Sequence, residues 1–207
     1  MVIAMMTEKQ IWEKAVWVWE AGAKALEGLS REVSPAVMEK CVRMLAECRG
    51  RIFTSGAGTS AAAARKIAHS LSCIERPSSF LSPADAVHGG LGVVQPGDVG
   101  ILISKGGGTQ ELLALVPALK TKQIGIIGVT ENEESPLARA SDLLLKVRVE
   151  READEFNMLA TTSTMAVIAV FDAVAIALMQ YTGYTREQFA VIHPRGAIGE
   201  RLLGKRP

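Results

Sequence analysis

The chain has 207 residues, which is long enough for one domain with a hydrophobic core and too short for several such domains. Its 23 Lys and Arg residues nearly balance 22 Asp and Glu residues, and the resulting net charge of +1 argues against a general nucleic-acid or membrane-surface binder. Hydrophobic residues make up 48% of the chain and charged residues 22%, so the composition excludes a disordered chain.

The cysteines and the apolar stretches indicate the compartment. Cys41, Cys48 and Cys73 fit reduced core thiols better than a disulfide framework, and no Cys-x-x-Cys or close Cys/His pair favours a metal site. No stretch reaches the length of a membrane-spanning helix, and the short apolar start at residues 1–6 has no basic segment before it. We therefore expect a cytoplasmic protein that binds neither membrane nor nucleic acid.

The first fifty residues are predicted to form two helices. The first, over residues 9–29, carries a wide apolar stripe made of Ile11, Trp12, Ala15, Val18, Trp19, Gly22, Ala25, Leu26 and Leu29. A stripe of this width predicts packing against a partner chain or burial within the chain itself, and the sequence leaves both open. The second helix begins after Ser34-Pro35 and ends at Arg49-Gly50.

After Gly50, short β-rich runs alternate with helical runs. The expected strands are residues 51–54, 79–81, 99–103, 124–129 and 143–147. The expected helices are residues 60–74, 83–88, 111–122, 136–140 and 161–181. This alternation predicts an α/β fold with a parallel sheet whose crossover helices cover both faces.

Two loops rich in glycine and hydroxyl residues each lead from a predicted strand into a predicted helix. They are residues 55–60 (Ser-Gly-Ala-Gly-Thr-Ser) and residues 104–109 (Ser-Lys-Gly-Gly-Gly-Thr), and a third hydroxyl run, residues 161–164, opens the long helix. Ligands of open parallel sheets bind outside the carboxyl ends of the strands. Glycines let backbone N–H groups approach an anion, and a helix N-terminus adds partial positive charge. Together these segments favour a phosphate site.

The first loop also matches the G-x-G-x-x-A pattern of dinucleotide-binding folds. That pattern expects an acidic residue about twenty positions on, at the end of the next strand. Here the next strand ends at Leu81-Ser82, and Asp85 lies in the helical turn that follows. A nicotinamide enzyme is therefore the weaker interpretation, and the absence of G-K-[ST] disfavours ATP hydrolysis.

Few side chains are suited to acid–base chemistry. His88 precedes Gly89-Gly90 in a predicted turn, and His193 precedes Pro194; a loop histidine of this kind serves either proton transfer or structure. Glu111 starts the helix after the second glycine loop, where a negative charge is also favourable for the helix alone. The acidic residues in 150–155 follow a strand and can equally form a solvated cluster.

A set of collinear segments carries a family resemblance. The segments are residues 56–60, 82–92, 95–98, 104–111, 150–153, 161–164 and 193–199. Together they resemble the sugar isomerase (SIS) domain family, and within it the arabinose-5-phosphate isomerase-like branch. The resemblance covers about residues 35–203. It implies one SIS domain over residues 1–207, with a helical segment at about 8–49 and a tail at about 190–207. The implied fold is a flavodoxin- or Rossmann-like three-layer αβα arrangement with a five-stranded parallel sheet.

The resemblance also implies a homodimer or homotetramer that binds a phosphosugar and interconverts aldose and ketose through an enediol, with no cofactor and no metal. Glu152 is then the base that moves a proton between C1 and C2, His193, from the same or a neighbouring subunit, assists ring opening, and His88 and Glu111 complete the site. A carboxylate in a partly dry pocket is expected to have its pKa raised toward neutrality. The implied phosphate and sugar contacts are Ser55, Gly56, Gly58, Thr59, Ser60, Ser104, Lys105, Gly106, Gly107, Thr109, Thr161, Thr162, Ser163 and Thr164.

The sequence departs from the family pattern at several positions. Thr59 stands where the family carries a lysine, and Lys105 and Gly108 replace Asn and Glu in the second loop. We interpret Lys105 as the source of the phosphate-binding charge that Thr59 cannot supply. Residues 154–157 (Asp-Glu-Phe-Asn) replace Cys-Pro-Leu-Gly, so arabinose 5-phosphate is not assigned as the substrate. The sequence ends at Pro207, before the paired CBS domains that the branch often adds.

Two functions fit these residues. The first is the phosphosugar isomerase, and the second is a phosphosugar-binding regulatory module that has lost catalysis. A regulator of this kind carries a DNA-binding or other output segment. The first fifty residues contain no basic recognition helix, which favours the enzyme.

Overall fold

A five-stranded, all-parallel sheet forms the centre of the computed structural model, which describes residues 6–194. The strands are β1 (Ile52–Gly56), β2 (Ser78–Phe80), β3 (Val99–Ile103), β4 (Gly125–Thr130) and β5 (Leu143–Lys146). Their order is β2-β1-β3-β4-β5, so the chain changes direction across the sheet between β1 and β3. The α/β fold with a five-stranded parallel sheet is therefore confirmed.

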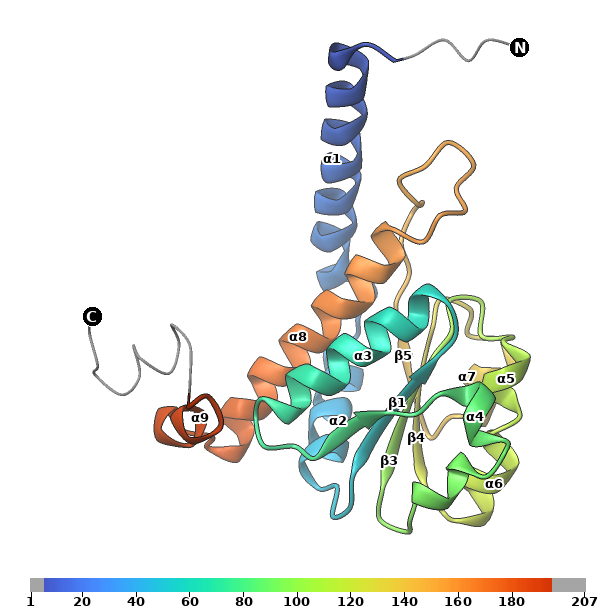
Figure 1. Ribbon diagram of the computed structural model, residues 1–207, viewed down its shortest axis with the longest axis vertical. Coiled ribbons are helices and arrows are strands. Elements are labelled where there is room, and N and C mark those ends of the chain that lie inside the picture. Colours follow the sequence, from blue (N-terminus) through green and yellow to red (C-terminus); the bar gives the residue numbers. More distant parts are fainter. Residues whose placement is uncertain (1–5, 195–207) are drawn as a thin grey trace.

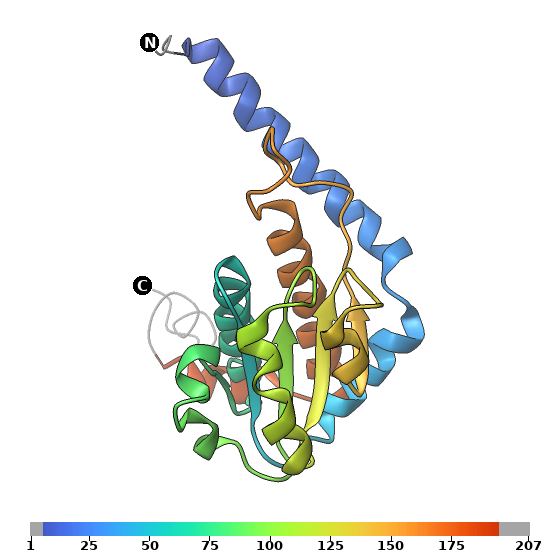
Figure 2. The ribbon, with the colours of Figure 1, turned by 90° about the vertical axis from the view of Figure 1, so that its right-hand side faces the viewer.

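Helices cover both faces of the sheet and enclose two cores (Figures 1 and 2). One face is covered by α2 (Pro35–Ala46), α3 (Thr59–Ser72) and α8 (Thr162–Thr182). The other is covered by α4 (Pro83–Ala86), α5 (Gln110–Leu113), α6 (Val116–Thr121) and α7 (Pro136–Ala140). The three-layer αβα arrangement follows, since each face of the parallel sheet carries apolar side chains that a helix layer must bury.

The expected helix over residues 111–122 is wrong in one respect, because the structure divides it into α5 and α6. Pro117 lies in the first turn of α6, where its missing N–H and fixed φ are tolerated, whereas a continuous helix would place it inside. Two further helices, η1 (Gly90–Val93) and α9 (Arg186–Ile192), were not predicted from the sequence. A capping box between Thr185 and Gln188 opens α9, and that spacing was a readable signal.

The long apolar helix α8 corrects the expectation that no stretch reaches membrane-spanning length. It has 21 residues and a mean hydropathy of 2.0, so by length and composition alone it could cross a membrane. In the structure α8 packs against α1 (Glu8–Glu32), α2 and α3, and its Val170, Phe171 and Val174 lie in the core. These contacts make α8 a core helix of this fold.

The N-terminal helix α1 projects beyond the rest of the domain (Figures 1 and 2). Its second half packs on the core through Ala25 and Leu29, but Gly22 is its only buried residue. Trp12 and Trp19 are 61% and 60% exposed and contact each other edge to face, with ring centroids 5.5 Å apart. Burial of the whole stripe within the chain itself is therefore wrong, because the first half of α1 extends past the sheet.

The three cysteines are free thiols. Cys41 lies in α2 and is fully buried, and burial raises the pKa of its thiol to about 12. Cys48 lies within the helix expected to end at Arg49-Gly50, but α2 ends at Ala46, so Cys48 follows the helix in the structure.

Candidate active site

Three helix starts meet at the carboxyl edge of the sheet, at the point where the strand order reverses. The two glycine loops follow the neighbouring strands β1 and β3 and lead into α3 and α5, and α8 begins at the same edge (Figure 1). They enclose a cavity of about 50 Å³ whose lining includes Ser60 of α3, Lys105 of the second loop, and Ser163 of α8. Switch points of this kind are the usual ligand sites of open parallel sheets.

The second glycine loop holds itself in a fixed shape and leaves amides free. The Ser104 hydroxyl lies 2.7 Å from the Thr109 hydroxyl and accepts a 3.1 Å hydrogen bond from the Gly107 amide. Gly107 has φ +69°, a conformation that favours glycine. Within residues 6–194, the backbone N–H groups of Lys105, Gly106, Gly108 and Thr109 donate to no other residue. Free amides at a helix start can bind an anion.

The first glycine loop is shaped mainly by packing. A Cβ on Gly56 would lie 2.8 Å from the Ser60 carbonyl, so this glycine is needed where β1 meets the first turn of α3. Ser55 is buried, and its hydroxyl donates a 2.8 Å hydrogen bond to the Leu81 carbonyl, which leaves that donor unavailable to a ligand. Gly58 has φ +55° before α3, and Thr59 begins that helix with an exposed side chain.

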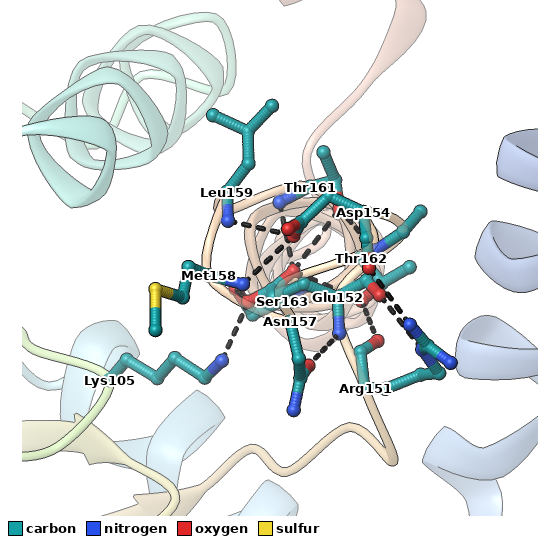
Figure 3. A network of polar contacts seen from close by, with 11 residues as sticks. Lys105, Arg151, Glu152, Asp154, Asn157, Met158, Leu159, Thr161, Thr162 and Ser163 are labelled. Carbon is teal, nitrogen blue, oxygen red and sulfur yellow. Dashed lines mark hydrogen bonds and ion pairs between the residues drawn. The ribbon is translucent and has the colours of Figure 1, made fainter.

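The carboxylate of Glu152 lies at the N-terminus of α8 and is fully buried (Figure 3). Its Oε1 lies 2.7 Å from Lys105 Nζ and also accepts a short hydrogen bond from the Ser163 hydroxyl. Its Oε2 accepts from the amides of Thr161 at 2.9 Å and Ser163 at 3.2 Å. The Thr161 hydroxyl donates to Oε2 at 3.2 Å. The Thr162 hydroxyl lies 3.1 Å from Oε2 but donates its proton to the closer Arg151 carbonyl. Glu152 thus occupies the anion-binding position of this helix start.

These donors decide the charge state of Glu152. Burial raises the pKa of the carboxyl, but Lys105, the Ser163 hydroxyl and the amides of Thr161 and Ser163 outweigh it and lower the pKa to about 2. The expectation that a partly dry pocket raises this pKa toward neutrality is therefore wrong for this structure. Its physical reason is that hydrogen bonds and an ammonium group stabilise the charged form more than desolvation penalises it.

The segment after Glu152 is ordered by its own polar side chains. Asp154 accepts hydrogen bonds of 2.8 Å from each of the amides of Phe156, Met158 and Leu159, and Asn157 accepts one of 2.7 Å from the Glu152 amide. Neither role was predicted from the sequence, although Asp and Asn commonly accept hydrogen bonds from nearby amides in loops. The segment presents three apolar side chains to solvent, those of Phe156, Met158 and Leu159.

The remaining acids of this segment behave as surface charges. Glu150 and Glu155 form exposed ion pairs of 2.6 Å with Lys24 and Lys14 of α1. The solvated-cluster interpretation is confirmed for these two residues and is wrong for Glu152. The ion pairs also place the loop alongside α1.

The other expected catalytic residues lie outside the Glu152 network. His88 follows α4 and Glu111 lies in the first turn of α5, and both are exposed. His193 ends α9, stacks on Phe189 with centroids 4.0 Å apart, and lies 2.9 Å from the Phe189 carbonyl through Nδ1. Glu152 lies at the N-terminus of the 21-residue α8, about 30 Å long, whereas His193 follows its C-terminus through α9, so the two lie at opposite ends of α8. The expected tail beyond residue 194, with most of the 193–199 segment, lies outside the described residues.

This arrangement defines a class of protein: a parallel α/β domain with an anion-binding crevice at its switch point. Residues 44–177 match the model of the SIS domain, and the chain belongs to the SIS domain family. Among residues 6–194, no group of three or more His, Cys, Asp or Glu side chains is arranged to hold a metal ion.

Solved and curated relatives agree with this assignment. A candidate sugar-phosphate isomerase from Listeria monocytogenes is 52% identical with a TM-score of 0.91, over 92% of this chain and 100% of the other. A protein of Escherichia coli CFT073, solved in complex with arabinose 5-phosphate, is 34% identical with a TM-score of 0.87, over 91% of this chain and 100% of the other. Arabinose 5-phosphate isomerase KpsF of Escherichia coli O6:H1 is 38% identical over 179 residues, 86% of this chain and 55% of that protein. The chain spans about half the length of the curated relatives it matches.

Gly107→Ala is expected to lower the free energy of unfolding by about 1–3 kcal/mol. A Cβ at this position would overlap the Ser135 side chain, and the positive φ disfavours alanine. Gly108→Ala is the matched control, because no atom lies within 4 Å of its added Cβ. Denaturant unfolding compares both variants with the wild type, and equal losses in the two variants would contradict the prediction.

Glu152 is expected to make stability depend on pH in the acid range. Because its pKa falls from 4.5 to about 2 on folding, its contribution is complete above pH 4.5 and is lost as the pH falls toward 2. At pH 7 the wild type is expected to be more stable than Glu152→Gln by about 1–3 kcal/mol, since the substitution removes acceptors from buried donors. Urea unfolding at several pH values measures the difference, and a difference that stays constant below pH 4.5 would contradict the assignment.

Proposed function

We propose that the chain is a phosphosugar isomerase that interconverts aldose and ketose phosphates through an enediol. The observation that carries the proposal is the buried Glu152 carboxylate at the start of α8, joined to Lys105 of a glycine loop with free amides. The curated relatives are named as isomerases, which favours the enzyme over the alternative, a non-catalytic phosphosugar-binding regulatory module.

The proposed roles follow from the position of each group. The free amides of residues 104–109, with the hydroxyls at the start of α3 and that of Thr164 in α8, hold the phosphate. The hydroxyls of Thr161 and Ser163, also expected to contact the phosphate, bind Glu152 instead. Glu152 removes the proton from the hydroxyl-bearing carbon beside the carbonyl, and the carbonyl oxygen gains a proton from solvent, which forms the enediol. The Glu152 acid then returns its proton to the former carbonyl carbon, and the hydroxyl on the other carbon loses its proton to solvent as the new carbonyl forms. One carbon of the substrate is oxidised as its neighbour is reduced, so the reaction needs no redox cofactor. We place the protein in the cytoplasm, where its proposed substrate class belongs.

We further propose that the active form is a homodimer or homotetramer. The cavity of about 50 Å³ is well below the few hundred Å³ typical of small-molecule sites, so this cavity is too small to hold a whole phosphosugar. The exposed Trp12 and Trp19 offer a surface for a second copy. A neighbouring subunit can supply His193, which the same chain holds beyond the C-terminus of α8, whereas Glu152 lies at its N-terminus. His88 and Glu111 are proposed to complete the site from the rim.

The enzyme is expected to exchange substrate hydrogen with solvent. NMR of pentose and hexose phosphates in deuterated water should show exchange at C1 or C2 for at least one sugar. Glu152→Gln should abolish exchange while phosphosugar binding remains, and Glu150→Gln, which alters an exposed carboxylate nearby, should leave exchange unchanged.

Two outcomes would revise this proposal. Exchange that persists in Glu152→Gln would place the base on another residue. Phosphosugar binding without exchange in the wild type would identify the regulatory module.

Charging the exposed α1 stripe is expected to weaken the oligomer. Trp12→Glu combined with Trp19→Glu places two carboxylates on the proposed contact surface and should lower the mass measured by sedimentation. Val93→Glu is the matched control, since Val93 is 62% exposed in η1. An unchanged mass in the double variant would show that α1 is not an interface.

A further inference from the structure

Lys105 lies between the Glu152 carboxylate and the glycine loop on which the substrate phosphate is proposed to bind. Its main chain is fixed, because its carbonyl accepts a 2.7 Å hydrogen bond from the Thr130 hydroxyl and a 3.0 Å bond from the Glu131 amide. Its side chain is 39% exposed, whereas that of Glu152 is 1% exposed. The ammonium therefore lies at the boundary between the buried carboxylate and the cavity that Lys105 also lines.

Glu152 does not depend on Lys105 to stay in place. Without the ammonium it still accepts hydrogen bonds from Thr161 and Ser163, both at the start of α8. The ammonium is thus the mobile partner, carried on a flexible four-carbon stem, while the α8 donors are part of a rigid helix start.

The glycine loop offers Lys105 a second partner. An anion held by the free amides of Lys105, Gly106 and Gly108 would lie on the loop from which the Lys105 side chain projects. Within residues 6–194, Lys105 is the only cationic side chain that lines the cavity. A phosphate dianion on the loop amides would compete with Glu152 for this ammonium.

We propose that Lys105 is shared, pairing with Glu152 in the empty site and moving to the phosphate when a phosphosugar binds, so that the substrate's own phosphate releases the base. The inference rests on the proposed function and adds a means of activation to it. The pKa of Glu152, about 2 while the ammonium is in place, then rises because its cationic partner has left and a negative group has arrived.

The other charged groups around Glu152 are already committed elsewhere. Arg151 donates to the carbonyls of Glu152 and Asp154, and its guanidinium lies 5.3 Å from the Trp17 ring centre. Asp154 is bound by three loop amides, and Glu150 pairs with Lys24. Lys105 is therefore the partner whose movement changes the charge balance at the carboxylate.

The sharing is tested by binding of inorganic phosphate to four forms: wild type, Glu152→Gln, Lys105→Gln and the double variant. Glu152→Gln frees the ammonium and should tighten the phosphate Kd by about tenfold, as calorimetry would measure. Lys105→Gln should weaken phosphate binding less in the wild type than in Glu152→Gln. In the wild type, phosphate gains the Lys105 contact only by breaking the ion pair between Lys105 and Glu152, so less binding energy depends on the lysine. Lys105→Gln in the Glu152→Gln background should undo the tightening. Lys120→Gln, which breaks a 2.7 Å ion pair with Asp142, is the control and should leave the Kd unchanged.

A second measurement needs no change at Glu152. Carboxyl-carbon NMR should show that inorganic phosphate raises the pKa of Glu152 in the wild type. The rise should be smaller in Lys105→Gln, whose Glu152 has no ammonium to lose. Equal rises in the two proteins would overturn the sharing.

The possible outcomes separate this inference from the proposed isomerase. If Glu152→Gln has the same effect on the phosphate Kd with and without Lys105, the sharing is overturned, even where hydrogen exchange shows an active isomerase. If hydrogen exchange is absent but the effect of Glu152→Gln on the phosphate Kd depends on Lys105, the isomerase proposal is wrong. The sharing of Lys105 is then supported as a feature of phosphate binding alone. If wild-type protein binds no phosphate, both the sharing and the phosphate site are wrong.

Discussion

The N-terminus of α8 requires a negative charge, and the chain supplies one from its own Glu152. The free amides and hydroxyls of this helix start would otherwise be buried without acceptors, at the end of a helix that packs into the core. The same carboxylate joins the segment that follows β5 to the start of α8, and it forms an ion pair with Lys105. The helix start, the loop before it and the second glycine loop are thereby held in one polar network.

This constraint separates what the sequence could predict from what it could not. Alternating β-rich and helical runs predicted the parallel sheet, because strand and helix periodicity are local properties. The glycine loops that follow strands predicted that several helix N-termini would lie at one edge of the sheet, because the carboxyl ends of parallel strands all meet at that edge. The position of Glu152 at that edge was implied by the family resemblance, and the structure brings it to the start of α8 beside the second loop.

The lowered pKa of Glu152 could not be predicted from the sequence. The sign of a pKa shift depends on how many donors reach the carboxylate, and those donors depend on a turn that Asp154 and Asn157 build. The division of the 111–122 helix was within reach, since Pro117 marks it. The distance between His193 and Glu152 was not, because it is set by the full length of α8.

The edges of the sheet limit how copies of this domain can associate. β2 has three residues and β5 has four, so each edge offers very little unpaired backbone to another strand. Short edge strands protect a sheet from extending into a neighbour and from aggregating through its backbone. Self-assembly by strand addition is thus disfavoured at both ends, and the helical surfaces are left as the routes by which the domain can join another molecule.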